Sequence, residues 1–197
     1  MGALRSSLGE PRGGAAVAAI LRGGTQGPEV LLIRRAHVVG DPWSGQMAFP
    51  GGRREPDDPD LLTTVLRETR EEVGLDLAHD AELLGRLDDT PTHRPGLVVT
   101  PYVFALARSV TVRPSPREVA EALWQPLAPL AAGHRDTTYR YVDPRGSFDL
   151  PAFDLEGRIV WGLTYRMLGL LFEAVRRSPG QGPGKSGAIG ARESNGG

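Results

Sequence analysis

Residues 66–75 read LRETREEVGL, and this short segment holds three glutamates, Glu68, Glu71 and Glu72. Residues three and four positions apart are neighbours on a helix, so these carboxylates repel one another by about 0.2–0.5 kcal/mol per pair. The ordinary explanation of such a segment is a solvated helix face with arginine partners such as Arg67. The sequence therefore raises the question of what else neutralises this side of the helix.

The helix that carries the glutamates is predicted to cover residues 59–73. Asp58 and Pro59 are typical of an N-cap and a first helical position, and Gly74 is typical of the residue that follows a helix C-terminus. At 100° per residue the apolar side chains fall on one stripe, and the glutamates fall about a third of a turn or more away. We therefore expect one buried face and one exposed acidic face that includes Glu72.

The loop before this helix favours a metal site over a plain solvated surface. Phe49, Pro50, Gly51 and Gly52 supply an apolar anchor, a fixed turn and two residues whose backbone can approach an ion or a phosphate closely. Mg²⁺ and Mn²⁺ prefer carboxylate, carbonyl and water oxygens, and Mg²⁺ commonly combines one or two carboxylates with substrate phosphates. We predict that Mg²⁺ or Mn²⁺ neutralises the acidic face.

Length and composition predict one soluble domain. The chain of 197 residues is long enough for a single core of ordinary size. Its formal net charge of -1 gives no field that attracts nucleic acid or an anionic membrane, and no apolar run is long enough to span a bilayer. Because the chain has no cysteine, disulfides and thiolate metal sites are excluded. We expect a cytoplasmic protein with no nucleic-acid or membrane partner.

Both ends of the chain are predicted to lie outside the folded domain. The glycine-rich terminal segments contain few residues to bury, so burial does not offset the entropy lost on ordering them. We expect a flexible N-terminal segment over 1–14, a folded domain over 15–177 and a disordered glycine-rich tail over 178–197.

The remaining pattern predicts an α+β fold. Short apolar runs bounded by glycine and proline are typical of strands, and the first two flank a turn typical of a hairpin. The predicted strands are 15–21, 29–34, 83–87, 97–107 and 122–125, and apolar spacing predicts a late helix over 160–176. A central helix and a late helix packed on mixed strands suggest an α/β/α sandwich.

The segment from Gly52 to Leu75 resembles the Nudix box, whose pattern is G-x5-E-x7-R-E-U-x-E-E-x-G-U with U an apolar residue. Gly52 stands fifteen residues before Arg67, one more than in the pattern, and Pro59 stands where the early glutamate is expected when counting back from Arg67. We assign no residue to that early position. The second half of the pattern is matched by Arg67, Glu68, Glu71, Glu72, Gly74 and Leu75, with Thr69 at the first U position.

The preceding segment, LLIRRAHVVGDPWSGQMAFPGG, resembles one branch of this superfamily, the coenzyme A pyrophosphatases, with the signature L-L-T-x-R-[SA]-x3-R-x3-G-x3-F-P-G-G. Ile33 replaces the threonine, Gly40 stands where the second arginine is expected, and one extra residue precedes Gly45. The late FDLPAFDLEGRIVWGLTYRML is similar to the closing segment of that branch. The matching positions of the signature are Leu31, Leu32, Arg35, Ala36, Gly45, Phe49, Pro50, Gly51 and Gly52.

The resemblance implies the Nudix fold, an α/β/α sandwich with a mixed central sheet and a catalytic loop-helix-loop. It implies metal-dependent hydrolysis of a pyrophosphate bond in a nucleoside diphosphate derivative, with coenzyme A or its acyl derivatives split to 3′,5′-ADP and 4′-phosphopantetheine. The alternative enzyme is an ADP-ribose or dinucleotide polyphosphate pyrophosphatase. A noncatalytic Nudix-like binding domain is the alternative of another class, although such a domain should lose box carboxylates. The superfamily is also compatible with a homodimer.

The resemblance also implies a metal site. Glu68, Glu71 and Glu72 would hold Mg²⁺ or Mn²⁺, with the Gly52 carbonyl as a further ligand, and the metal would lower the pKa of an attacking water. Arg67 would orient a box glutamate through an ion pair. Because Glu72 is expected on the exposed face, Glu72→Gln is expected to abolish turnover and leave the fold intact.

The general base is left open between a box carboxylate such as Glu71 and a downstream acid, Glu118 or Glu121, with Glu118 preferred. Gly51, Gly52 and Arg35 are the predicted substrate contacts. Arg35 matches the branch signature, and the neighbouring Arg34 should point to the opposite face of its strand.

Three further residues in loops have two interpretations each. His93 and Arg94 lie in a proline-bounded loop, where they either cover the diphosphate or, as is commoner, face solvent. Trp43 either stacks on an adenine or packs against the protein.

Overall fold

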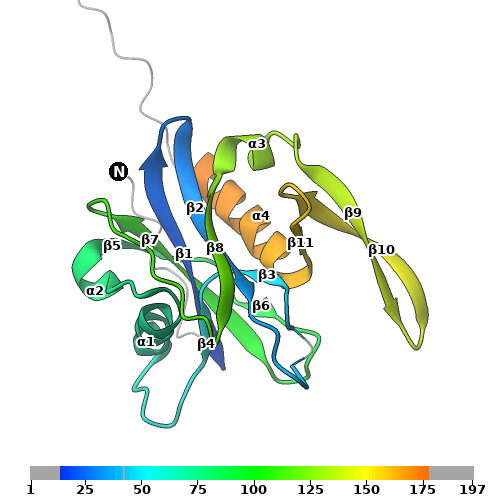
Figure 1. Cartoon of the computed structure of the whole chain (residues 1–197), viewed down its shortest axis with the longest axis horizontal. Helices are drawn as coiled ribbons and strands as arrows, with labels where there is room; N and C mark the ends of the chain where they lie inside the picture. Colours follow the sequence, from blue (N-terminus) through cyan, green and yellow to red (C-terminus); the bar gives the residue numbers. More distant parts are fainter. Residues whose placement is uncertain (1–13, 42, 178–197) are drawn as a thin grey trace, which may run out of the picture.

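The computed structural model describes residues 14–41 and 43–177, and its elements surround one mixed sheet (Figure 1). Apart from Gly14, the predictions for 1–14 and 178–197 lie outside the described residues. In chain order the elements are β1 (Ala15–Gly24), β2 (Gly27–Arg35), β3 (Met47–Ala48), β4 (Gly51–Arg53), α1 (Leu61–Val73), α2 (Leu77–Asp80), β5 (Ala81–Arg86), β6 (Thr90–Pro91), β7 (Val98–Leu106), β8 (Val119–Pro126), α3 (Leu127–Ala131), β9 (Asp136–Asp143), β10 (Gly146–Asp154), β11 (Ile159–Trp161) and α4 (Gly162–Arg177).

The central sheet is mixed, as predicted. Its main path is β3-β2-β1-β7-β5, and β4, β6 and β8 pair with β1, β7 and β2 respectively. β1 and β7 are parallel, whereas β1 and β2 form the predicted antiparallel hairpin. Gly27 closes this hairpin with φ of 107°, a conformation that favours glycine. Among the described helices, none is both long and apolar enough to cross a membrane.

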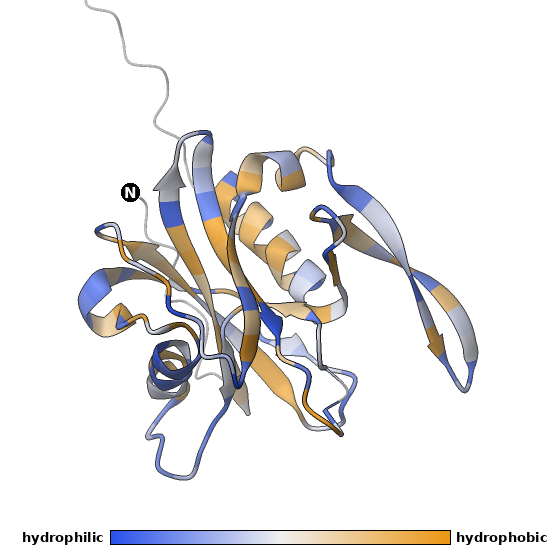
Figure 2. Ribbon diagram, in the orientation of Figure 1, coloured by the Kyte–Doolittle hydropathy of each residue, from blue (hydrophilic) through white to orange (hydrophobic). Residues whose placement is uncertain are grey.

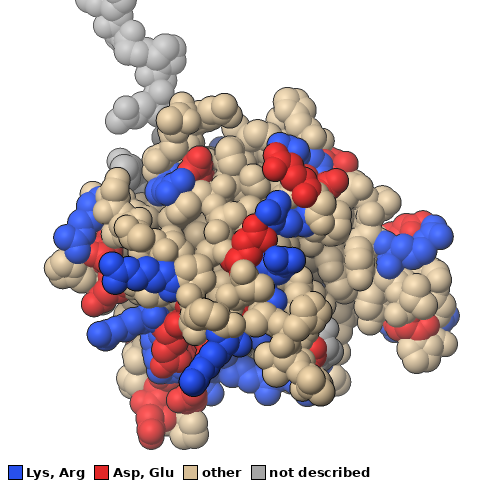
Figure 3. Space-filling model, viewed as in Figure 1, with Lys and Arg blue, Asp and Glu red and all other residues tan. Residues whose placement is uncertain are grey.

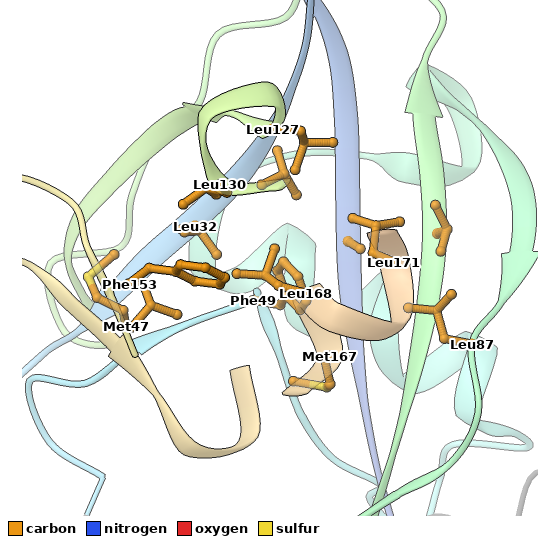
Figure 4. Packing of buried hydrophobic residues seen from close by; sticks show 14 of the residues in the cluster. Leu32, Met47, Phe49, Leu87, Leu127, Leu130, Phe153, Met167, Leu168 and Leu171 are labelled. Carbon is orange, nitrogen blue, oxygen red and sulfur yellow. The ribbon is translucent and has the colours of Figure 1, made fainter. Parts of the chain in front are cut away.

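Both faces of the sheet are apolar, because successive side chains of a strand point to opposite sides. On β2, Leu31 and Ile33 belong to the core cluster that includes α1, whereas Val30 and Leu32 belong to the cluster that includes α4. Figure 2 shows the apolar colouring of the central strands, and Figure 4 shows Leu32 and α4 side chains such as Leu168 in the second cluster. This two-sided burial places the sheet between α1 and α4.

α1 begins two residues later than predicted and ends where predicted. Its N-cap is Asp60, whose carboxylate accepts the Thr63 N–H at 2.7 Å, so the prediction of Asp58 as the cap is wrong. Gly74 ends the helix in the left-handed conformation with φ of 69°, as expected for a residue that needs no Cβ. The loop contains two acidic residues able to cap the helix, and Asp58 is engaged elsewhere, with Arg67.

α4 covers the other face and begins at Gly162 rather than at residue 160, because Val160 belongs to β11. Met167, Leu168 and Leu171 are buried on the sheet, and Val175, near the end of the predicted apolar stripe, is 57% exposed. The last turn of α4 therefore lies beyond the core.

A small sheet of β9, β10 and β11 was not predicted. Its strands β9 and β10 form a long hairpin that projects from the rest of the protein (Figure 1), and Tyr139 stacks on Trp161 with ring centroids 4.3 Å apart. Its β9 strand alternates exposed and half-buried residues, which is the period-two pattern of a strand with one covered face. Val142 at an exposed position and Asp143 at a half-buried position obscure this pattern in the sequence.

Candidate active site

Glu72 is buried, contrary to the expected exposed position. It is 3% exposed, and its Oε2 accepts the Gly51 N–H at 2.8 Å. Seven positions separate Val65 from Glu72, so the two side chains share nearly the same side of the helix and both enter the core. Burial raises the pKa of Glu72 to about 8, and the nearby charge of Glu68 acts in the same direction.

Glu68 lies against the glycines of the preceding loop. Its side chain is 17% exposed, and a Cβ on Gly52 would overlap its carboxylate. A Cβ on Gly51, whose φ is 140°, would overlap the Ala16 carbonyl. Burial raises the pKa of Glu68, while the charge of Arg67 opposes that rise. Gly52 therefore allows the loop to pack directly against the acidic helix, and Gly51 allows it to pack against β1.

Arg67 joins two of the three glutamates. Its Nη1 lies 3.2 Å from Glu68 Oε1 and 3.3 Å from Glu71 Oε2, and its Nη2 donates to the Arg53 carbonyl at 3.2 Å. Glu71 is the most exposed of the three, with 53% of its side chain accessible. These are the ion pairs that the predicted positioning role of Arg67 requires, and that role stays a prediction. Figure 3 shows acidic and basic side chains gathered over α1.

Comparison with known proteins assigns the family. Residues 11–144 match the model of the NUDIX domain. This chain belongs to the Nudix family. The uncharacterized Nudix hydrolase NudL of Photorhabdus laumondii is 32% identical over 153 residues, covering 76% of this chain and 78% of that protein. As a Nudix hydrolase, the protein acts on pyrophosphate bonds.

Two further similarities are partial. An uncharacterized protein of Schizosaccharomyces pombe is 41% identical over 112 residues, but the match covers 54% of this chain and only 34% of that protein's length. A MutT/nudix family protein from Enterococcus faecalis superposes with a TM-score of 0.50 at 18% identity, covering 88% of this chain and 64% of the other. At this identity the superposition supports the Nudix fold alone.

Asp58 lies in the early part of the Nudix box, at which the sequence predicts no functional residue. It is 5% exposed, and its carboxylate accepts hydrogen bonds from Arg67 Nε at 3.2 Å and from Arg67 Nη2 at 3.0 Å. The hydrogen bonds from Arg67 hold the pKa of this carboxyl well below its usual range. Counting forward from Gly52 by the spacing of the pattern reaches Asp58, so the extra residue lies between Asp58 and Arg67. Counting back from Arg67 reaches Pro59 instead and therefore misses Asp58.

Arg35 and Glu118 lie close enough to the box to affect its charges. The charge of Arg35 lowers the pKa of Glu72, and the charge of Glu118 raises the pKa values of Glu68 and Glu72. Pairing of β2 with β8 sets Arg35 opposite Val119, the residue after Glu118. Long-range strand pairing thus brings both predicted residues to the glutamates.

Glu121, the other candidate base, is engaged elsewhere. Arg158 Nε donates to its Oε1 at 2.9 Å, and Arg34 Nε lies 3.4 Å from its Oε2. The hydrogen bond from Arg158 lowers the pKa of Glu121, which makes it a weaker proton acceptor. His93 and Arg94 are both exposed, and the Arg94 guanidinium lies 5.3 Å from the Trp43 ring centroid.

The acidic residues suit a hard cation by their chemistry. Within the described residues, no group of three or more His, Asp or Glu side chains is gathered closely enough to hold a metal ion as it stands. Glu68 and Glu72 nevertheless offer only oxygen donors, and burial disfavours their negative charge. A divalent cation would compensate that charge, so the donor set fits Mg²⁺ or Mn²⁺.

Proposed function

We propose that this Nudix hydrolase cleaves the pyrophosphate of coenzyme A or its acyl derivatives to 3′,5′-ADP and 4′-phosphopantetheine. The observation that carries the proposal is Arg35, the arginine of the branch signature. Its Nε is buried and has no hydrogen-bond partner among the described residues, while its Nη2 is held by Asp41 Oδ2 at 2.9 Å. A buried donor beside the glutamates suits a diphosphate oxygen, because an unpaired buried N–H is costly.

The loop that carries the signature supports this assignment. The Gly45 N–H donates to the Arg35 carbonyl at 3.1 Å, and the Arg35 N–H donates to the Gln46 carbonyl at 3.0 Å. The chain therefore returns to Arg35 before it enters the FPGG segment. Gly40 replaces the second arginine of the signature, so this site has one cationic contact fewer than the signature provides.

Glu68, Glu71 and Glu72 are the side chains that we propose hold the cation, together with the Gly52 carbonyl. Nudix hydrolases generally use divalent metals such as Mg²⁺ or Mn²⁺. Such ions neutralise phosphate oxygens and lower the pKa of an attacking water. Gly52 contributes by letting the backbone approach this site without a Cβ in the way, and Gly51 contributes its N–H to Glu72.

The protein's own contribution is positioning and proton transfer. Arg67 fixes Glu68 and Glu71 by ion pairs, so the carboxylates need not reorganise during reaction. We propose that the carboxylate of Glu118 accepts the proton of the attacking water, with Glu71 as the alternative acceptor among the box carboxylates. Glu121 is less suited because its hydrogen bond with Arg158 lowers its pKa, so its carboxylate accepts a proton less readily.

The test is a substrate panel with product identification. Purified protein with Mg²⁺ or Mn²⁺ is incubated with coenzyme A, ADP-ribose, NADH and diadenosine polyphosphates, and products are identified by mass. We expect 3′,5′-ADP and 4′-phosphopantetheine at the highest kcat/KM. Preferential hydrolysis of ADP-ribose or a dinucleotide polyphosphate would replace the proposal by the alternative enzyme.

Two variants separate the candidate bases. Glu118→Gln should lower kcat by about 10²-fold or more, whereas Glu121→Gln should leave kcat within a few-fold of the wild type. Equal losses in both variants would remove Glu118 from the role of base. The cytoplasmic location and the homodimer stay predictions.

A further inference from the structure

A groove of about 530 Å³ lies beside the box and plays no part in the chemistry above. Its three charged lining residues are all arginines, Arg53, Arg54 and Arg94, and its lining also includes Gly14 and Gly96. This volume falls in the range of small-molecule sites. A concave surface whose charged residues are all cationic favours an anion.

The three guanidinium groups lack carboxylate partners. Within the described ranges none of them forms an ion pair, whereas most other arginines of the surface do. Arg54 donates to the carbonyls of Asp58 and Pro59 at 3.0 and 2.6 Å, and its charge contributes to lowering the pKa of Asp60. Arg53 and Arg94 keep their charge uncompensated by any carboxylate of the described chain.

Local contacts hold Arg54 and Arg94 in place. The Thr92 hydroxyl donates to the Leu97 carbonyl at 2.9 Å and accepts the Arg94 N–H at 3.1 Å, which closes the loop that carries Arg94. The Arg94 guanidinium faces the Trp43 ring. The hydrogen bonds from Arg54 to the Asp58 and Pro59 carbonyls fix a second arginine of the lining. A cationic site prepared in this way binds an anion with a smaller loss of side-chain entropy.

The groove adjoins the box through one strand. Arg53 follows Gly52, against which Glu68 packs. The Arg53 carbonyl accepts a hydrogen bond from Arg67 Nη2. Alternation along β4 directs the Arg53 side chain away from the face on which Glu68 lies. The groove and the glutamates therefore both border β4. Gly52, which contacts Glu68, and Arg53, which lines the groove, are consecutive residues whose Cα atoms are about 3.8 Å apart.

We propose that this groove is a subsite for a phosphate monoester on the nucleotide part of the substrate, in addition to the diphosphate that is cleaved. The proposal rests on the proposed function, because it assumes that the diphosphate lies at the glutamates. Arg53 and Arg94 supply the charge, and Arg54 shapes the wall. The groove and the glutamates both border β4, which places the two proposed sites next to each other along the chain.

Coenzyme A and 3′-dephospho-coenzyme A test the subsite, because they differ by one phosphate monoester. The wild type should show a kcat/KM about tenfold higher for coenzyme A. An Arg53→Ala/Arg94→Ala double variant should bring the ratio close to one, while its kcat/KM for the dephospho form stays within about twofold. An Arg176→Ala/Arg177→Ala double variant removes the same number of charges from the exposed end of α4 and should leave the ratio unchanged. A ratio that survives in a folded double variant overturns the subsite, even if both substrates are hydrolysed.

A binding measurement keeps the two proposals separable. Adenosine 3′,5′-bisphosphate and adenosine 5′-monophosphate are titrated into metal-free full-length protein by calorimetry. Tighter binding of the bisphosphate that disappears in the double variant supports the subsite even if coenzyme A is not hydrolysed. Equal affinities of the two nucleotides for the wild type would refute it, whatever the enzyme hydrolyses.

Discussion

α1 and α4 cover opposite faces of the same sheet, yet they differ in how well their buried polar groups are satisfied by partners. On α4, Thr164 Oγ1 donates to the Met47 carbonyl at 3.0 Å. On α1, Thr69 Oγ1 is buried without a hydrogen-bond partner among the described residues, and buried Glu72 has a pKa raised by desolvation. The buried Thr164 of α4 is therefore satisfied, whereas α1 retains buried groups that cost stability. Such local violations are expected where a site must bind charge.

The largest difference between the helices should appear in catalysis. Glu72→Gln should lower kcat by about 10²–10³-fold, because the amide cannot supply the negative charge that the cation requires. The same substitution on α4, Glu173→Gln, changes an exposed residue paired with Arg177 and should leave kcat unchanged. Steady-state kinetics with saturating Mg²⁺ measure both. Full activity of Glu72→Gln would remove this residue from the site.

A large stability effect is expected from the α4 side. Leu168 is fully buried, so Leu168→Ala should lower the free energy of unfolding by about 2–5 kcal/mol through lost burial and a cavity. Val175→Ala on the exposed end of the same helix should change it by less than about 0.5 kcal/mol. Urea denaturation gives both values. A small loss for Leu168→Ala would mean that the α4 side packs loosely.

Glu72 of α1 should make the stability of the metal-free protein depend on pH. The folded-state pKa of Glu72 is raised to about 8, so the folded protein holds this proton more tightly than the unfolded chain. Stability is therefore highest below the unfolded pKa and falls as the pH rises through about 8. With chelator present, wild-type stability should fall by roughly 1–4 kcal/mol between pH 5 and 9.

Glu72→Gln provides the control, because its amide oxygen can still accept the Gly51 N–H. This variant should show a flatter profile and exceed the wild type in stability at pH 9. Parallel pH profiles of the two proteins would contradict the burial of the charge as the cause.

The smallest expected effect compares the two threonines. Thr69→Val should raise the free energy of unfolding by about 1 kcal/mol, because it removes a buried hydroxyl without a partner. Thr164→Val should lower it by about 1–3 kcal/mol, because the Met47 carbonyl loses its donor. Thermal or urea unfolding of the two variants side by side measures the contrast. Effects of the same sign would show that the helices do not differ in this respect.

The sequence by itself determined the elements whose causes are local. Gly74 ends α1 because the left-handed conformation needs glycine, and the turn at Gly27 joins β1 to β2. Spacings of three and four residues, as between Glu68 and Glu72 or Arg67 and Glu71, place these side chains next to one another on one helix. These features depend on backbone conformation and on residues close in the chain, so a pattern can carry them.

Tertiary structure alone decided which charges are buried and which partners they find. Glu72 enters the core because the FPGG loop and the sheet cover that side of α1, and Asp58 reaches Arg67 across a loop whose extra residue masks the spacing. The pairing of β2 with β8 brings Glu118 to the box, and the return of residues 92–97 toward β4 forms the arginine groove. Burial and charge coupling depend on contacts between distant segments, which is why periodicity along one helix could not reveal them.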